Sequence, residues 1–299
     1  MLNVAFDDYP QTHALKRGEV KSDRVALNFS DIRPANKFFK PMVRELRFDI
    51  SEMAIATYLQ AKAYGKPLVL LPATVMGRFQ HGTILYNAAR GTITPADLPG
   101  KRIGVRSYSQ TTVTWVRGIL ANDYGVDLDR LHWVSQEDGH VAEYREPVGV
   151  ERAAPDKNLP QMLRDGEVDA AIFGAALPTD PMFRSVIPEP NRAAEQWSAR
   201  HKVVPINHMV VATEELSRCN PEALQEVFRL LLESKRTAGL PKAGSIDFLP
   251  FGLDGCQPAL RLMIEYTTQQ KLLPRPLALD DLFDETTRAL SPEMGGLAS

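Results

Sequence analysis

Residues 102–120 read RIGVRSYSQTTVTWVRGIL, which is a short apolar segment, a polar loop and then a helical pattern. The apolar segment Arg102–Val105 has the length and composition of a strand in a covered sheet. In the helical part, apolar side chains recur every three or four residues and share one face, namely Val113, Val116, Ile119 and Leu120. A strand that runs through a loop into a helix is the unit of α/β folds, so this stretch predicts an α/β protein.

The alternation of strands and helices continues on both sides of this stretch. Leu2–Phe6 predicts a first strand, and the polar residues 7–9 follow at its carboxyl end, where α/β folds bind ligands. Ser51 is a plausible N-cap for a helix through Gln60, and the apolar run Pro67–Pro72 predicts a central strand. Asn220, followed by proline and glutamate, predicts the start of a later helix.

A chain of 299 residues exceeds what one hydrophobic core usually serves, so two lobes are expected. Turn residues cluster at residues 92–100, and a strand-like segment at residues 203–211 returns the chain. We therefore expect a discontinuous lobe 1 from residues 1–95 and 208–299, and an inserted lobe 2 from residues 96–207.

Charge and hydropathy argue against nucleic acid and membranes as binding partners of this protein. The 35 basic and 37 acidic residues leave a formal charge of −2, which provides no general attraction to nucleic acid or to an anionic membrane. The sequence has no run of about 20 apolar residues for a membrane span. The first residues lack a signal-peptide pattern, so we expect a cytoplasmic protein, either monomeric or a homo-oligomer, with a small-molecule ligand.

Metal and cofactor signatures are weak. Cys219 and Cys256 are too few and too isolated for a disulfide framework or a zinc cluster. His140 and Glu143 have the spacing of a helical ligand pair but lack a third nearby ligand. We predict no cofactor, although the sequence does not exclude a divalent metal.

The start of the helix after residue 110 is the first candidate anion site. A helix N-terminus exposes unpaired N–H groups and partial positive charge, which suit a carboxylate. Ser109, Thr111 and Thr112 add hydroxyl donors, and Arg117 lies lower on the same helix. An ordinary capped junction is the alternative.

A second candidate site follows the apolar run at residues 67–72. Arg78 is able to clamp a carboxylate through two parallel hydrogen bonds, and His81 is able to move protons near neutral pH. Alone, this pair is better explained by a solvent-facing loop. His208 on the returning strand and Glu52 at another predicted strand end strengthen the functional interpretation.

Several ordered blocks resemble the 4,5-dihydroxyphthalate decarboxylase family, and they are RFDISEM at residues 47–53, RFQH at 78–81, SYSQTTVTWVRGIL at 107–120 and VPINH at 204–208. The resemblance implies a two-lobed type II periplasmic-binding-protein-like α/β fold with a ligand cleft between the lobes. It also implies a carboxy-lyase of phthalate degradation that acts on an aromatic carboxylate. Gln80 and Arg106-Ser107 depart from the family pattern, which bears on the substrate rather than on the fold.

The implied reaction is non-oxidative loss of CO₂ after protonation of the ring carbon that bears the carboxylate. His81 or His208 is the expected proton donor, and Glu52 orients a histidine or accepts a phenolic proton. The expected substrate-binding residues are Arg78, Tyr108, Ser109, Thr111, Thr112, Trp115 and Arg117. As alternatives to substrate binding, Trp115 is a core residue of its helix and Arg117 is a partner in a structural ion pair.

Two other functions remain open from the sequence. A solute-binding protein for a small aromatic or sulfonated anion would use the same arginine and helix start without chemistry. A biosynthetic or sensory protein of the same fold would use the histidines for recognition alone. Turnover of an aromatic acid separates the enzyme from both.

Overall fold

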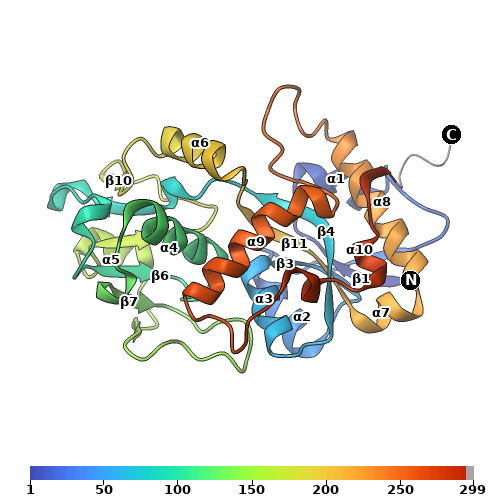
Figure 1. Cartoon of the computed structure of the whole chain (residues 1–299), viewed down its shortest axis with the longest axis horizontal. Helices are drawn as coiled ribbons and strands as arrows, with labels where there is room; N and C mark the ends of the chain where they lie inside the picture. The colour runs from blue at the N-terminus through green and yellow to red at the C-terminus, as the bar shows by residue number, and fades with distance from the viewer. Residues whose placement is uncertain (294–299) are drawn as a thin grey trace. The chain divides into compact units, whose positions relative to one another are not determined.

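The structure is a computed structural model that describes residues 1–293 (Figure 1), and the chain forms two compact units. Unit 1 contains residues 1–78, 140–142 and 204–293 of the described chain. Unit 2 contains residues 79–139 and 143–203. The sequence predicted that the chain passes from lobe 1 to lobe 2 after residue 95 and returns to lobe 1 after residue 207. In the structure the main passages between the two units follow residues 78 and 203. The first differs because residues 84–87 form a strand of the unit 2 sheet.

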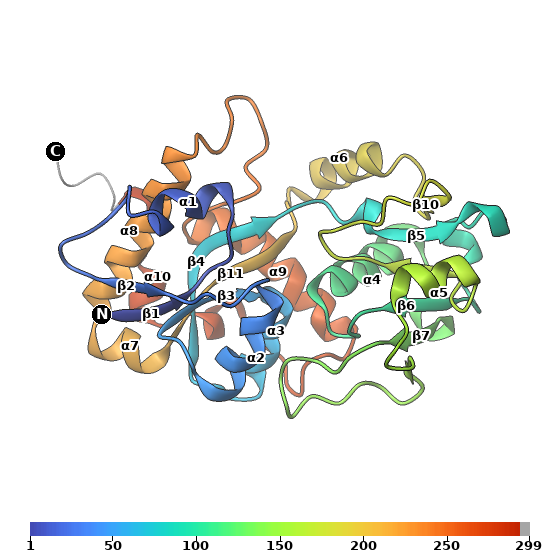
Figure 2. The same cartoon turned by 180° about the vertical axis from the view of Figure 1, so that it is seen from behind.

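Unit 1 is built on a five-stranded mixed sheet with the order β2-β1-β3-β11-β4. The strands are β1 (Leu2–Ala5), β2 (Leu27–Phe29), β3 (Ile50–Ala54), β4 (Leu68–Gly77) and β11 (Ile206–Thr213). The first three run parallel, and β11 lies antiparallel between β3 and β4. Figure 2 shows these strands side by side within unit 1. The sheet therefore joins segments that are far apart in the sequence.

Residues 51–53 correct the sequence prediction, because they lie in β3 and not in a helix. The helix α3 begins only at Ile55 and ends at Ala63. β3 pairs with β1 on one side and with β11 on the other, and every residue of β3 is buried. Pairing on both sides outweighs the local capping preference of Ser51. Glu52 consequently projects from a buried strand.

The apolar run at residues 67–72 is a strand, as expected, but not a central one. β4 lies at the end of the unit 1 sheet order. Pro72 cannot donate a hydrogen bond to a neighbouring strand, and proline in sheets is largely confined to such edge positions. The edge position also leaves the carboxyl end of β4, at residues 75–78, next to the segment around Phe248.

Helices cover the unit 1 sheet and complete its core. They are α1 (Pro10–Lys16), α2 (Asn36–Glu45), α3 (Ile55–Ala63), α7 (Glu214–Cys219), α8 (Pro221–Thr237), α9 (Leu253–Gln269) and α10 (Glu285–Arg288). The predicted start of α8 is confirmed, because the Asn220 side chain accepts a hydrogen bond from the Ala223 N–H at 3.2 Å. The apolar face of α8 packs into one cluster with strand residues such as Val4, Leu71 and Val210.

Unit 2 contains a six-stranded sheet with the order β10-β5-β9-β6-β7-β8. Its strands are β5 (Ile84–Asn87), β6 (Arg102–Val105), β7 (His132–Ser135), β8 (Glu151–Arg152), β9 (Ala170–Ile172) and β10 (Phe183–Ser185). The helices are α4 (Thr111–Tyr124), α5 (Leu159–Asp165) and α6 (Pro190–His201). α4 and α5 lie on opposite faces of the sheet, since they exchange front and back between Figures 1 and 2. The strand, loop and helix predicted at residues 102–120 are confirmed.

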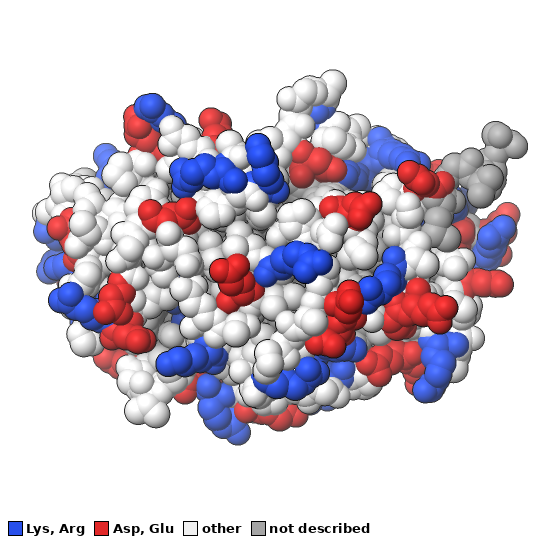
Figure 3. All heavy atoms as spheres, viewed as in Figure 1, with Lys and Arg blue, Asp and Glu red and all other residues white. Residues whose placement is uncertain are grey.

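Short 3-10 helices mark several turns, and they are η1 (His81–Thr83), η2 (Ala88–Arg90), η3 (Pro95–Asp97), η4 (Leu128–Arg130) and η5 (Leu279–Leu282). On the face drawn in Figure 3, basic and acidic side chains are interspersed, which agrees with the near-neutral formal charge. Among residues 1–293, no helix combines the length and apolar composition needed to cross a bilayer.

Candidate functional site

Glu52 and His208 form a buried carboxylate–imidazole pair in unit 1. The His208 Nδ1 atom lies 2.5 Å from Glu52 Oε1. The Glu52 side chain is fully buried, whereas 16% of the His208 side chain is exposed. β11 pairs antiparallel with β3, which places Val210 opposite Glu52 and His208 two residues further along. Because Nδ1 faces the carboxylate, Nε2 is the ring nitrogen left to exchange a proton with a ligand.

Two residues of the first loop complete the surroundings of Glu52. The Tyr9 hydroxyl donates to Oε1 at 2.8 Å, and the Asp7 backbone N–H donates to Oε2 at 3.0 Å. Burial raises the pKa of the Tyr9 hydroxyl, and the neighbouring Glu52 charge raises it further. Tyr9 therefore stays protonated at neutral pH. Three donors hold the buried carboxylate and compensate for its removal from water.

Tyr9 also lines a cavity of about 250 Å³ in unit 1. Its walls come from the start of α1, the end of β4 and a loop before α9, and they are formed by Tyr9, Gln11, Val75, Met76, Gly77, Arg78, Phe248 and Leu249. Met76 pairs with His208 across β4 and β11, so the cavity borders the strand that carries the histidine. Register shifts at His208 mark a bulge-type irregularity, a feature that changes the direction of side chains at functional sites.

Arg78 is the charged residue of this cavity wall. Burial lowers the pKa of its guanidinium to about 10, which still leaves it positively charged at pH 7. Its backbone N–H donates to the Pro205 carbonyl at 3.1 Å, which ties the end of β4 to the segment that leads into β11. A guanidinium in a cavity wall is suited to a carboxylate ligand.

An aromatic cluster supports the histidine from one side. The Phe39 ring meets the His208 ring edge-to-face, with centroids 5.1 Å apart. The same Phe39 ring contacts His140 at 5.5 Å, and His140 Nδ1 lies 2.8 Å from the Thr57 hydroxyl. Packing against a buried phenylalanine restricts the His208 ring to a narrow range of orientations.

His81 occupies a different environment, within unit 2. Only 1% of the residue is exposed, and its ring packs edge-on against Trp197 at 5.7 Å. The buried Nδ1 has no hydrogen-bond partner among residues 1–293. Burial lowers the pKa of His81 to about 4, so its imidazole is neutral at pH 7. A neutral imidazole is a poor proton donor, and this environment favours His208 over His81 for that role.

The predicted anion site at the start of α4 forms as a local structure in unit 2. The helix begins at Thr111, and Ser109, Thr111 and Thr112 are each no more than 5% exposed. Arg78 lies in unit 1, so the two groups of predicted carboxylate anchors belong to different units. The part of these three hydroxyl residues in binding stays a prediction.

Tyr108 and Arg117 are brought together in unit 2. The Arg117 guanidinium lies 3.9 Å from the centroid of the Tyr108 ring, and Nη2 donates to the Tyr108 carbonyl at 2.8 Å. Arg117 is fully buried, and burial lowers the pKa of its guanidinium. Trp115 is also fully buried and packs on Trp197 at 6.2 Å, which matches its core alternative.

The sequence placed residues 7–9 at a strand end where α/β folds bind ligands, but it assigned no role to Asp7 or Tyr9. Phe39 was not predicted as part of the site. No sequence pattern linked Phe39 to His208, since their contact depends on the packing of α2 beside β3 and β11. Among residues 1–293, no group of three or more His, Cys, Asp and Glu side chains is arranged to hold a metal ion.

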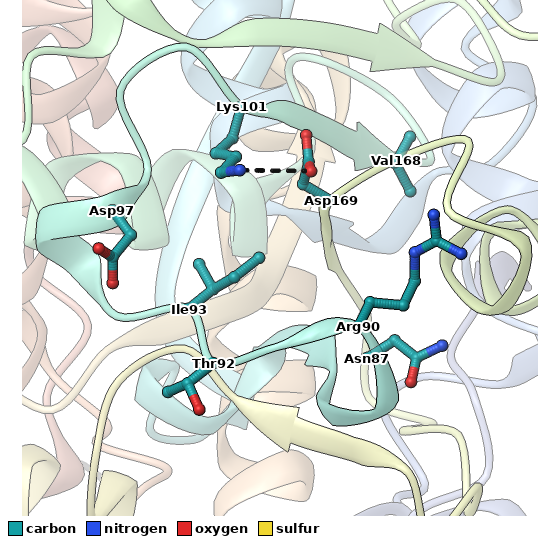
Figure 4. A pocket seen from close by; sticks show the side chains of 8 residues that line it. All are labelled: Asn87, Arg90, Thr92, Ile93, Asp97, Lys101, Val168 and Asp169. Carbon is teal, nitrogen blue, oxygen red and sulfur yellow. Dashed lines mark ion pairs between the residues drawn. The ribbon is translucent and has the colours of Figure 1, made fainter.

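A second hollow, of about 390 Å³, lies in unit 2 (Figure 4). Its charged side chains include both signs, and Lys101 pairs with Asp169 at 3.7 Å. The Asp97 carboxylate is already bound to the Thr94 N–H at 2.9 Å. Neither cavity wall contains a histidine, but the wall of the unit 1 cavity includes Tyr9, whose hydroxyl donates to Glu52 of the carboxylate–imidazole pair. The unit 1 cavity is therefore the stronger candidate for proton transfer.

Solved structures with similar folds define the class of the protein. The alkanesulfonate-binding protein SsuA from Xanthomonas axonopodis pv. citri, bound to MOPS, aligns with a TM-score of 0.61 and 14% identity over 95% of this chain and 97% of that chain. The aliphatic sulphonate binding protein SsuA from Escherichia coli aligns with a TM-score of 0.59 and 12% identity over 94% and 95% of the two chains. This chain therefore has the α/β fold of periplasmic binding proteins.

The chain belongs to the 4,5-dihydroxyphthalate decarboxylase family. It is 32% identical over 209 residues to the 4,5-dihydroxyphthalate decarboxylase of Pseudomonas putida, covering 66% of this chain and 80% of that protein. It is 29% identical over 314 residues to the Comamonas testosteroni protein of that name, covering 97% and 94% of the two chains. No family model matches the chain. The expected family and fold are thus confirmed.

Proposed function

We propose that this protein is a carboxy-lyase that removes CO₂ from a hydroxylated, phthalate-like aromatic acid in aromatic compound catabolism. The observation that carries the proposal is the hydrogen bond between His208 Nδ1 and Glu52 Oε1, because it leaves a partly exposed imidazole next to a carboxylate. Related proteins named as decarboxylases support the same reaction class.

In the proposed reaction, protonated His208 donates the Nε2 proton to the ring carbon that bears the carboxylate. The bond between that carbon and the carboxylate then breaks, and its electron pair returns to the ring as CO₂ leaves. A hydroxyl group para to the carboxylate supplies electron density to the ring during protonation. His208 regains its proton from solvent, so one proton is consumed and one CO₂ is formed in each turnover.

The surrounding residues have separate tasks in this proposal. Glu52 fixes the imidazole orientation and compensates its positive charge before transfer, as a buried carboxylate does for a catalytic histidine. Arg78 anchors a substrate carboxylate through its guanidinium. The apolar wall residues Val75 and Leu249 exclude water, which strengthens both electrostatic interactions.

The test is CO₂ release and product formation from hydroxylated benzene dicarboxylates, measured with and without a chelator. Turnover of at least one compound that resists chelation supports proton donation by His208 without a metal. Turnover lost on chelation would require a metal and contradict the mechanism. Binding without any turnover across the panel would contradict the enzyme and favour a solute-binding protein.

A further inference from the structure

Tyr9 is shared by the cavity and the buried carboxylate. Tyr9 forms part of the cavity wall, and its hydroxyl group donates a hydrogen bond to Glu52 Oε1 at 2.8 Å. A phenol has one O–H donor but also has acceptor lone pairs. Since the donor is used by Glu52, the Tyr9 oxygen is available to further partners as an acceptor only.

The Tyr9 acceptor differs in kind from the charged group of the same cavity. Arg78 offers N–H donors and no acceptor. The cavity wall therefore combines a cationic donor, which suits a carboxylate, with a neutral acceptor, which suits an O–H group. Gln11, another polar wall residue, is anchored by donation from Nε2 to the Val75 carbonyl at 2.6 Å.

Glu52 itself is not able to meet a ligand directly. Its side chain is fully buried, and three donors already occupy its oxygens, namely the Asp7 N–H, the Tyr9 hydroxyl and the His208 ring. The sequence suggested that Glu52 accepts a phenolic proton of the ligand. Tyr9 is better placed to contact that hydroxyl group, because it lines the cavity and also binds the Glu52 carboxylate.

We infer that Tyr9 is a specificity-determining residue that accepts a hydrogen bond from a phenolic hydroxyl of the ligand. This inference rests on the proposed function and deepens it, because it names the substrate feature that the unit 1 cavity selects. A ligand that lacks the hydroxyl leaves the Tyr9 oxygen without that bond, whereas its carboxylate still meets Arg78.

The test compares binding of 4,5-dihydroxyphthalate and phthalate by calorimetry in a His208→Asn background, which lacks the proposed proton donor and therefore does not turn over the ligand. The three proteins are this parent, the parent with Tyr9→Phe and the parent with the control Tyr64→Phe. Tyr9→Phe keeps the ring in the cavity wall and removes only the hydroxyl. Tyr64 lies at the carboxyl end of α3 and is not part of the cavity wall. The readout is the ratio of the two Kd values for each protein.

We expect Tyr9→Phe to reduce the preference for the dihydroxy compound by about tenfold, the loss typical of one hydrogen bond, while Tyr64→Phe keeps the ratio of the parent. An unchanged ratio in Tyr9→Phe would overturn the inference, including the case in which both affinities fall equally. A parent protein that binds neither compound, when wild-type protein binds neither as well, would overturn it too. Because binding is read in a background without turnover, a Tyr9-dependent ratio found together with an inactive wild-type protein would contradict only the proposed decarboxylation.

Discussion

His208 and Glu52 are 156 positions apart in the chain, yet the Nδ1 atom of one lies 2.5 Å from the Oε1 atom of the other. The antiparallel pairing of β11 with β3 produces this contact, because a late segment returns to the sheet beside an early strand. The pair is thus a property of the sheet of unit 1 and does not depend on any local motif.

Replacing Glu52 by glutamine is expected to lower decarboxylation by about 100-fold, at the lower end of what a positioned acid–base group contributes. The amide has no negative charge to compensate a protonated His208, and its NH₂ group opposes one of the three donors around it. The measurement is kcat across pH 5 to 9. Glu215→Gln changes an exposed carboxylate of α7 and serves as the matched control. Equal pH profiles for Glu52→Gln and wild type would contradict the assigned role.

Replacing Arg78 by lysine is expected to raise KM about tenfold with a smaller change in kcat, because an ammonium lacks the planar pair of donors that fits a carboxylate. Steady-state kinetics on the preferred acid give both values. Arg17→Lys is the control, since the Arg17 side chain is 64% exposed and pairs only loosely with Glu19 at 3.9 Å. An unchanged KM in Arg78→Lys would exclude this residue as a carboxylate anchor.

His81 is expected to make the protein less stable in mild acid. Its pKa is about 4 when folded, against 6.5 for an ordinary histidine, because burial disfavours the charged ring. The charged groups near it are Asp123 on α4 and Arg200 and His201 on α6. Between pH 6.5 and 4 the unfolded chain binds a proton that the folded chain does not, so the free energy of unfolding falls as pH falls.

The variant His81→Phe keeps an aromatic ring against Trp197 and removes the titrating group. Urea unfolding at pH 7 and pH 4.5 should show that wild type loses about 2 to 3 kcal/mol more stability than the variant over this interval. Parallel losses in the two proteins would show that His81 is not held neutral by burial. At pH 7, retained decarboxylation in His81→Phe is the expected result if His208 is the proton donor.

Gly77 is expected to tolerate no side chain. A Cβ atom at this position would lie 2.1 Å from the Phe248 carbonyl oxygen and 3.3 Å from that of Pro205, and neither backbone group moves easily. Gly77→Ala should therefore cost about 1 to 3 kcal/mol of stability and weaken ligand binding, because Phe248 forms part of the cavity wall. Thermal and urea unfolding provide the measurement.

The matched control is Gly174→Ala, whose added Cβ would have its nearest contact at an ordinary 3.5 Å, to the Gln110 side chain. This change should alter stability by less than about 0.5 kcal/mol. If the two alanine variants were equally stable, the segment around Phe248 would not be packed against the end of β4 as described.

Much of the local structure was predictable from residue patterns. The periodic apolar face of α4 and the Asn220-Pro221 start of α8 are local signals, and both elements form where they were expected. Ser51 gave an equally local capping signal and was misleading, because pairing of β3 on both edges outweighs the preference of one residue. Local patterns therefore predicted whether most segments form a helix or a strand, but they did not predict which elements pack or pair with one another.

By itself, the sequence determined the α/β class, the family and the residue types available for chemistry, because periodicity, capping residues and ordered motif blocks are written along the chain. Only the tertiary structure decided that Tyr9, Glu52 and His208 meet at one carboxylate, while His81 is buried and neutral against Trp197. The physical reason is that hydrogen bonding and desolvation depend on distances in space. Those distances are set by strand order and packing, which no short stretch of sequence contains.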